Sequence, residues 1–194
     1  MSFLLKSSSL LVFFIFGVAE SAFGQARPAA IRSASVSVFA GGSYVKPGFG
    51  EPGQVGYMFG GDYTPYFSRF YLKPSLEVRG SISPIGDSVG ENMFGGGLRV
   101  GHRYSRFTPY ADLLIGSGTL KYATPRAKPG GGFANSNNSL VYTYGGGLDI
   151  SILSGVAAKI DVQGSHWDTN PTFSQVFHPG WVSFGVVYTF FGAR

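Results

Sequence analysis

A period-two alternation of polar and apolar residues constrains the fold of this chain most strongly. In FYLKPSLEVRG (Phe70–Gly80), the charged Glu77 and Arg79 share one register, and Leu76 and Val78 share the other. This period is typical of a β-strand with one polar and one apolar face. The alternation does not show which face points inwards, because charges face outwards in a soluble barrel and inwards in a membrane-spanning barrel.

The pattern continues along the chain, and no convincing helix interrupts it. Strands are predicted at Val36–Val45, Val55–Thr64, Phe70–Ser81, Asn92–Arg103, Thr108–Tyr122, Ser139–Ile152, Val156–Trp167 and Trp181–Phe191. Short and long connections alternate strictly between them, and the longest is expected to be the loop ATPRAKPGGGFANSNN. Short turns at one end and longer loops at the other are typical of outer-membrane barrels. The sequence therefore predicts an all-β fold, an eight-stranded antiparallel up-and-down transmembrane β-barrel.

In the central part of each predicted strand, one face carries no charge. The charged residues that share the other face are Asp62, Lys73, Glu77, Arg79, Arg99, Asp112, Asp149, Lys159 and Asp161. A lipid-facing Arg or Lys at mid-depth costs roughly 2–4 kcal/mol, which explains the uncharged face. We therefore expect these residues to form a charge network inside the barrel that closes the lumen as a plug. Pro74 weakens the register of the third strand, because proline cannot donate to a ladder.

The composition agrees with this interpretation and excludes several classes. Only 13% of the residues are charged, against about 25% in soluble domains. The absence of Cys and the presence of only three His give no support for a metal site, and we expect no cofactor. The net charge of +5 is spread along the chain, so nucleic-acid binding is not expected.

The first residues differ from the rest. Lys6, the apolar run Leu10–Ala19 and the small residues up to Ala26 have the order of a secretory signal peptide. We predict a signal peptide at residues 1–24, a short lead-in at 25–34 and the barrel domain at 35–191. Cleavage after Gly24 and cleavage after Ala26 remain equally open.

Aromatic residues are expected to form a girdle at each membrane interface. The predicted girdles consist of Tyr63, Tyr66, Phe67, Tyr104, Phe107, Phe190 and Phe191 near the short turns, and of Tyr44, Tyr57, Phe94, Tyr142, Trp167 and Trp181 near the long loops. The glycine runs beside the charged residues follow loops and open strands, so a phosphate-binding loop is not expected. Their expected role is to leave room in a lumen that is only wide enough for side chains.

Two near-copies, FGGGLRVG (Phe94–Gly101) and YGGGLDIS (Tyr144–Ser151), each follow a long loop. With RFTPYADLLIGSG, AAKIDVQGSHW and the closing VSFGVVYTFF, they resemble strands of the small outer-membrane β-barrel family that includes OmpX and the membrane domain of OmpA. The resemblance spans about Ser35 to Phe191. It implies a bacterial outer-membrane location, and recognition of the last strand by the barrel-assembly machinery.

No catalytic residues are expected. Ser165 and His166 are adjacent and point to opposite faces of a strand, so they do not form a nucleophile–base pair, even with Asp168 nearby. The long loops offer contacts instead, because surface loops carry recognition. Arg126 and Lys128 suit lipopolysaccharide phosphates, and Phe173 and Phe177 suit an adhesive patch or a cover over the barrel mouth.

The function expected from these features is that of a non-enzymatic integral outer-membrane protein. Its role is structural or one of surface interaction through four long extracellular loops, with the lipid and lipopolysaccharide of the outer membrane as expected contacts. Three alternatives remain open: a narrow channel for ions or small solutes, an outer-membrane lipid-modifying enzyme, and a soluble lipocalin-like carrier.

Overall fold

Antiparallel β-strands make up most of the chain in the computed structural model, which describes residues 34–47, 52–65, 71–84, 89–127, 131–168 and 176–191. The strands are β1 (Ala34–Lys46), β2 (Gln54–Pro65), β3 (Lys73–Ser83), β4 (Val89–Gly101), β5 (Phe107–Ala127), β6 (Phe133–Leu153), β7 (Val156–Asp168), β8 (Val176–Phe177) and β9 (Gly180–Phe191). Within the described ranges, no helix has the length and apolarity needed to span a membrane. The predicted signal peptide lies outside the described residues and stays a prediction.

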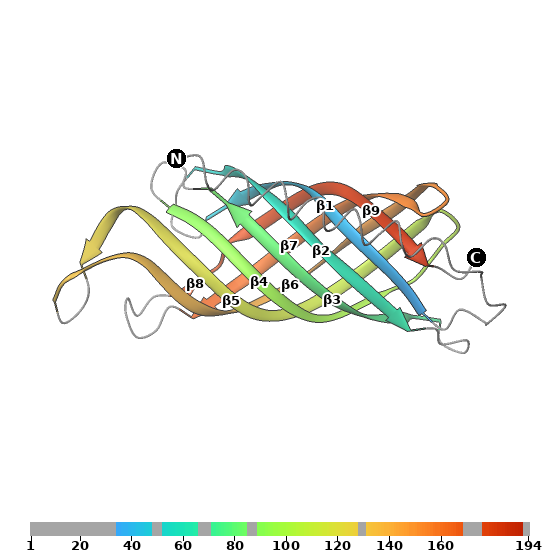
Figure 1. Ribbon diagram of the computed structural model, residues 1–194, viewed down its shortest axis with the longest axis horizontal. Coiled ribbons are helices and arrows are strands. Elements are labelled where there is room, and N and C mark those ends of the chain that lie inside the picture. Colours follow the sequence, from blue (N-terminus) through green and yellow to red (C-terminus); the bar gives the residue numbers. More distant parts are fainter. Residues whose placement is uncertain are drawn as a thin grey trace, which may run out of the picture. The chain divides into compact units, whose positions relative to one another are not determined.

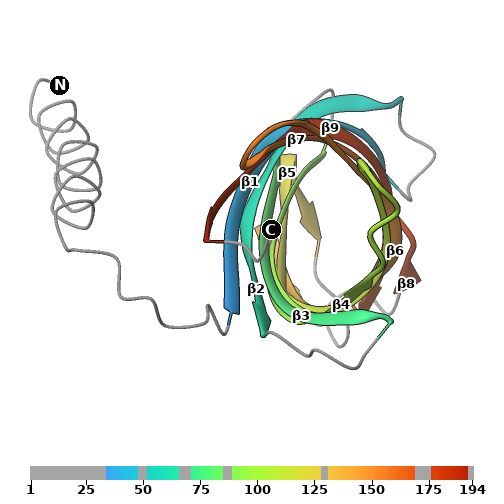
Figure 2. The same ribbon diagram turned by 90° about the vertical axis from the view of Figure 1, so that its right-hand side faces the viewer.

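Eight of these strands close into a barrel (Figures 1 and 2). Each strand from β1 to β7 pairs with its sequence neighbour, β7 pairs with β9, and β9 returns to β1, where Gly41 lies opposite Gly185. The two-residue β8 pairs only with the end of β7 and is not part of the closed wall. The predicted eight-stranded up-and-down barrel is therefore confirmed.

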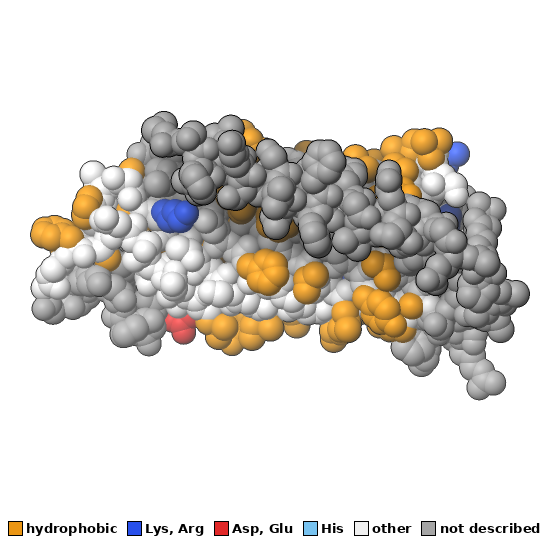
Figure 3. Space-filling model, in the orientation of Figure 1, with side chains coloured by type: hydrophobic (Ala, Val, Ile, Leu, Met, Phe, Trp, Pro, Cys, Tyr) orange, Lys and Arg blue, Asp and Glu red, His pale blue; other side chains and the backbone are white. Residues whose placement is uncertain are grey.

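The two faces of the wall are inverted relative to a soluble barrel. In β3, Glu77 and Arg79 are 1% and 2% exposed, whereas Leu76 and Val78 are 57% and 53% exposed. Figure 3 shows hydrophobic side chains along the strands, and the few charged side chains visible on that face lie away from its middle. An apolar exterior around a charged interior is the arrangement of a transmembrane barrel, and it excludes the soluble carrier.

The predicted aromatic girdles are partly wrong. Trp167 and Trp181 are 0% and 5% exposed and lie inside the barrel. Trp167 belongs to an apolar cluster at the loop end of the lumen, with Val89, Met93, Leu114, Leu120, Tyr122 and Val141. The reason is strand phase, because Trp167 shares the register of the inward Asp161, and Trp181 shares that of the inward Ser183.

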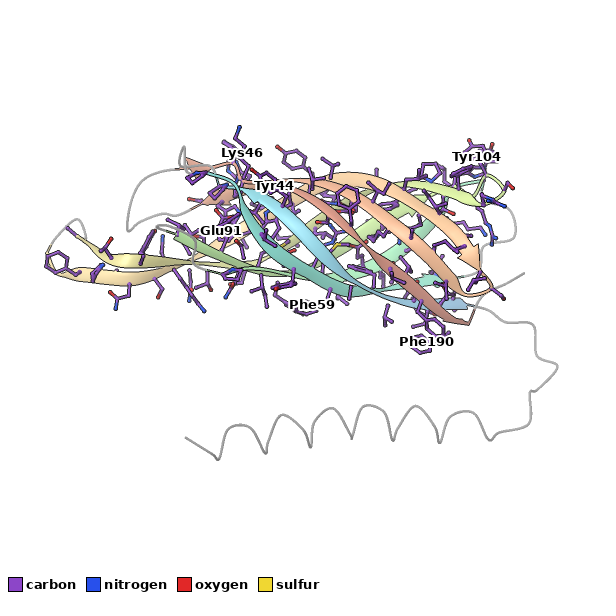
Figure 4. All side chains as sticks on the ribbon, turned by 90° about the horizontal axis from the view of Figure 1, so that it is seen from above. Tyr44, Lys46, Phe59, Glu91, Tyr104 and Phe190 are labelled. Carbon is purple, nitrogen blue, oxygen red and sulfur yellow. The ribbon has the colours of Figure 1, made fainter. Side chains whose placement is uncertain are left out.

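The other described members of the girdles are exposed. Tyr63, Tyr104, Phe107 and Phe190 lie near the turns, and Tyr44, Tyr57, Phe94 and Tyr142 lie near the long loops. Figure 4 shows Tyr44 at one end of the barrel, and Tyr104 and Phe190 at the other. Tyr66, Phe67 and the side chain of Phe191 lie outside the described part of the chain.

Most of the longest predicted loop is instead a two-stranded β-ribbon. β5 and β6 continue beyond the wall, to Ala127 and from Phe133. β4 accompanies β5 only as far as Tyr122, and β7 accompanies β6 only from Leu140. At roughly 3.4 Å per residue, these residues give a ribbon about 20 Å long. Figure 1 shows the two yellow strands projecting beyond the barrel at its loop end.

Pro74 does not disturb the wall. It lies opposite Val100 of β4 without a register shift, and the pairing of β3 with β2 begins only at Leu76. Its missing N–H therefore interrupts no pairing with β2.

The assigned faces can be tested in β3 with arginine. We expect Val78→Arg to lower the free energy of unfolding in lipid vesicles by about 2–4 kcal/mol, because its side chain would face the acyl chains. Ser75→Arg should cost much less, since Ser75 faces the lumen beside a cavity. Urea titration measures the free energy of unfolding of both variants, with heat-modifiable migration on a gel as the readout of the folded fraction. Equal losses would contradict the assignment.

Candidate functional site

The lumen holds an interior charge network, which consists of Asp62, Glu77, Arg79, Arg99, Asp112, Asp149, Lys159 and Asp161, all buried. These residues come from strands all round the wall, and their side chains point to the barrel axis because they share the inward register of each strand. Lys73, expected as a ninth member, differs: its side chain is exposed at the turn end and makes no ion pair with a described residue.

Arg79 is the centre of the first half of the network. Its Nε and Nη2 lie 2.7 and 2.6 Å from the Glu77 carboxylate. Nη1 donates to Asp161 at 2.8 Å, and Nη2 reaches Asp112 at 3.3 Å. The Gln163 side-chain amide donates to Asp112 at 2.9 Å and to Asp161 at 3.2 Å. A guanidinium suits this position because its five donors lie in one plane and hold several carboxylates at once.

Arg99 is the centre of the second half. It donates to Asp62 at 2.6 Å and, through its other terminal nitrogen, to Asp149. The Lys159 ammonium lies 3.6 Å from the second oxygen of Asp149. Each buried cation of the network therefore has an acidic partner, which is what burial of a charge requires.

Tyr110 and Phe39 join the two halves. The Arg99 guanidinium and the Lys159 ammonium lie 3.8 and 4.1 Å from the centre of the Tyr110 ring. The Tyr110 hydroxyl donates to Asp161 in the other half. Lys159 also lies 4.7 Å from the Phe39 ring. These cation–π contacts add to the ion pairs where water is excluded.

Glycines make the network possible at two positions in β6. A Cβ on Gly147 would meet the Tyr110 hydroxyl at 2.5 Å, and a Cβ on Gly145 would meet the Gln163 amide carbon at 2.6 Å. The inward glycines of YGGGLDIS therefore leave the space that these side chains fill. No phosphate-binding geometry arises, because the run lies inside a strand.

The network is unequal in charge. It contains five acids and only three bases. One oxygen in each of four carboxylates, on Asp62, Glu77, Asp112 and Asp149, has no hydrogen-bond partner among the described residues. The lumen at this depth is consequently filled by paired side chains with a surplus of acceptors.

Glu91 is a buried acid that the sequence analysis missed. It is 0% exposed, and neither carboxylate oxygen has a partner among the described residues. Its neighbour across the ladder is Ser83, whose hydroxyl is also buried without a described partner. The predicted fourth strand began at Asn92, three residues after the observed start of β4 at Val89, and therefore excluded Glu91. The inward phase of Arg99, extended to Val89, would have identified Glu91.

Ser165 and His166 do not form a catalytic pair. Ser165 is buried in the lumen, where its hydroxyl lies 3.3 Å from that of Thr143. His166 is on the opposite face of β7, and its ring lies 5.0 Å from that of His178. Asp168 is exposed at the end of the strand. No group of three or more His, Asp or Glu in the described ranges is arranged to hold a metal ion.

The predicted loop contacts are only partly covered. Lys128 and Phe173 lie outside the described residues. Arg126 and Phe177 belong to β5 and β8 through their backbone, but their side chains are outside the described set. Their predicted roles stay predictions.

The comparisons with known proteins concern the fold. No protein-family model matches the chain, and no curated protein matches it. Among solved structures, Neisserial surface protein A is similar at 13% identity and a TM-score of 0.50, over 80% of this chain and 96% of that chain. Ail, the attachment invasion locus protein of Yersinia pestis, is similar at 17% identity and a TM-score of 0.52, over 81% of this chain and 97% of that chain.

The inverted wall and these similarities define the class of the protein. It has the fold of the small eight-stranded outer-membrane β-barrels. Within that fold, this chain has the interior charge network, the apolar cluster at the loop end of the lumen, and the projecting ribbon.

The unpartnered carboxylate of Glu91 leads to a prediction about stability. Glu91→Gln should raise the free energy of unfolding by at least about 1 kcal/mol, because it removes a buried charge that lacks a partner. Asp161→Asn is the matched control, since Asp161 accepts from Arg79, Tyr110 and Gln163. It should destabilise by about 3–5 kcal/mol.

Equilibrium urea unfolding in lipid vesicles at neutral pH measures both variants. A loss of stability in Glu91→Gln would show that the carboxylate is compensated within the lumen.

Proposed function

We propose that this protein is a non-enzymatic integral protein of the bacterial outer membrane, of the OmpA- and OmpX-like kind, with a structural and surface-interaction role. The observation that carries this proposal is the β5–β6 ribbon, which projects from a barrel whose lumen is filled. In outer-membrane barrels the longer loops face the outside of the cell and the short turns face the periplasm, so the ribbon would reach outwards.

The ribbon has the chemistry of an interaction surface. Between residues 121 and 138 the chain carries Lys121, Arg126 and Lys128 and no acid. Phe133, near its tip, is 74% exposed. Beyond the wall, the described register gives β5 and β6 no partner other than each other, so each offers a free strand edge. Such an edge can pair with another extended chain.

The bases of the ribbon favour an anionic partner. The phosphates of lipopolysaccharide carry charge at the height where the ribbon leaves the wall, and charge-assisted hydrogen bonds from Lys and Arg to phosphate are strong. We therefore propose that the ribbon contacts lipopolysaccharide. The exposed Phe133 and the free edges would add contacts to a protein or saccharide above it.

A channel is the less favoured function. An aqueous path would have to cross the interior charge network and then the apolar cluster around Trp167, and both fill the lumen with buried side chains. A lipid-modifying enzyme is favoured less again, because Ser165 lies inside the lumen and His166 on the opposite face of β7. The last strand, β9, supports assembly by the barrel-assembly machinery, since it ends in Phe190 and Phe191.

Charge neutralisation tests the role of the ribbon. We expect the triple variant Lys121→Gln, Arg126→Gln, Lys128→Gln to bind lipopolysaccharide on the order of a hundredfold more weakly, because three bases at about 1 kcal/mol each near an anionic surface contribute about 3 kcal/mol. Surface plasmon resonance of the barrel in phosphatidylcholine nanodiscs, over immobilised lipopolysaccharide, measures the change. The matched control removes three bases from the opposite end, with Lys73→Gln, Arg103→Gln and Arg106→Gln. Equal losses of lipopolysaccharide affinity in the two variants would contradict the proposal that the ribbon is the binding surface.

Electrical recording tests the filled lumen separately. The purified barrel in a planar lipid bilayer should show no discrete single-channel currents, because its ion pairs and its apolar cluster leave no continuous water column. A general porin reconstituted in the same way is the positive control. Reproducible current steps would replace the structural role with that of a narrow channel.

A further inference from the structure

The turn end of the lumen contains a cavity of about 230 Å³, between the barrel mouth and the interior charge network. The bases Lys73, Arg99 and Arg103 line it, together with several serines and threonines, among them Ser75, Thr108 and Ser151. We propose that this cavity, the turn-end vestibule, binds a compact oxyanion, specifically a phosphate group. This inference is independent of the ribbon and of its partner.

The first argument is that two cations of the vestibule lack acidic partners. Lys73 and Arg103 make no ion pair with any residue in the described ranges, whereas Arg79, Arg99 and Lys159 deeper in the lumen all do. Lys73 lies opposite Gly101 in the β3–β4 ladder, and Arg103 follows Gly101 by two residues, just beyond the end of β4. Lys73, Gly101 and Arg103 all line the cavity.

The second argument concerns the single acid of the lining. Asp149 is the only Asp or Glu among the lining residues, and it is already bound by Arg99 and Lys159. The lining therefore has a formal charge of +2 from three bases and one acid. An anion that enters meets an excess of positive charge and no unpaired carboxylate of the lining.

The third argument is that Arg103 is held in place. The β4–β5 turn is closed by Tyr104 N–H donating to Phe107 O at 2.7 Å, and Phe107 N–H donating to Tyr104 O at 2.8 Å. Next to Arg103, the His102 ring stacks on Tyr71 with ring centres 3.7 Å apart. The Arg103 Nε donates to Ser105 O at 3.0 Å, and its terminal nitrogens remain for a ligand. A cation fixed in this way loses little freedom on binding.

The size and the hydroxyls define the class of ligand. The cavity is smaller than the roughly 300–1,000 Å³ of sites that hold drug-sized molecules, so it suits a compact ion or a small monoester. Hydroxyls and cations together match the several acceptor oxygens of phosphate. Since short turns face the periplasm in barrels of this class, the phosphate group would come from that side, as the free ion or as part of a small phosphate monoester.

Isothermal titration of inorganic phosphate into the full-length mature barrel in a zwitterionic detergent tests the proposal. We expect one saturable site, and we expect Lys73→Gln with Arg103→Gln to weaken binding at least tenfold. The matched control is Lys46→Gln at the loop end, which should change the affinity less than twofold. Heat-modifiable gel migration verifies that each variant is folded.

A second titration, with glycerol phosphate, distinguishes the two sources of the group. Tighter binding of glycerol phosphate assigns the site to a monoester, and tighter binding of inorganic phosphate assigns it to the free ion. Absence of saturable binding of either, or an equal loss in the loop-end control, would overturn the proposal.

Discussion

The cost of placing a charge in lipid is the constraint on which the rest of this structure depends. Every backbone group in a bilayer must be paired within the protein, and a closed barrel does this without a free edge. The strands then have only two faces, and lipid occupies one of them. All charged residues of the membrane-spanning part must therefore fit into a lumen that is only wide enough for side chains. Glu77 and Arg79 beside the exposed Leu76 and Val78 show this division within four consecutive residues.

Confinement of the charges explains the architecture of the lumen. In a space of low dielectric, an unpaired charge is costly and a paired one is strongly held. Arg79 and Arg99 each bind two or more carboxylates, and the rings of Tyr110 and Phe39 fill the space between them. The glycines of β6 supply the room. The same requirement for filling places Trp167 over Gly118, where a Cβ would lie 2.3 Å from the indole ring.

The sequence predicted the features that depend only on strand phase, that is, on which of the two alternating sets of residues in each strand faces the lumen. One strand register determines which residues face lipid, so eight of the nine expected network residues lie buried in the lumen. Lys73 shares their phase, yet it lies at the exposed mouth, because phase carries no information about depth. Glu91 and Trp167 also have the inward phase. Glu91 was missed because the fourth strand was predicted to begin after it. Trp167 was placed in an interface girdle because tryptophan is enriched at membrane interfaces.

Two other features, the ion-pair partners and the ribbon, could not be predicted from the sequence for physical reasons. The ion-pair partners depend on the stagger between strands far apart in the chain, such as β3 and β7 for Arg79 and Asp161, and no local pattern encodes it. The ribbon lies beyond the closed wall, and apolar and polar residues do not alternate regularly along it, so it gives no strand signal. One side of it is nevertheless covered in part, since Ala134 and Asn137 are 7% and 8% exposed. Its glycines, Pro125 and its asparagines are typical of a loop, and only the pairing of β5 with β6 shows otherwise.

The same constraint indicates where specific function can evolve in such a barrel. The outer face is restricted by lipid, and the middle of the lumen is restricted by the need to neutralise buried charge, so substitutions in either place mainly change stability. The two ends are free of both restrictions. The ribbon at one end and the vestibule at the other are separated by the interior charge network and the apolar cluster. Chemistry at the two ends should therefore be independent, which allows one surface to change its partner while the other keeps its own.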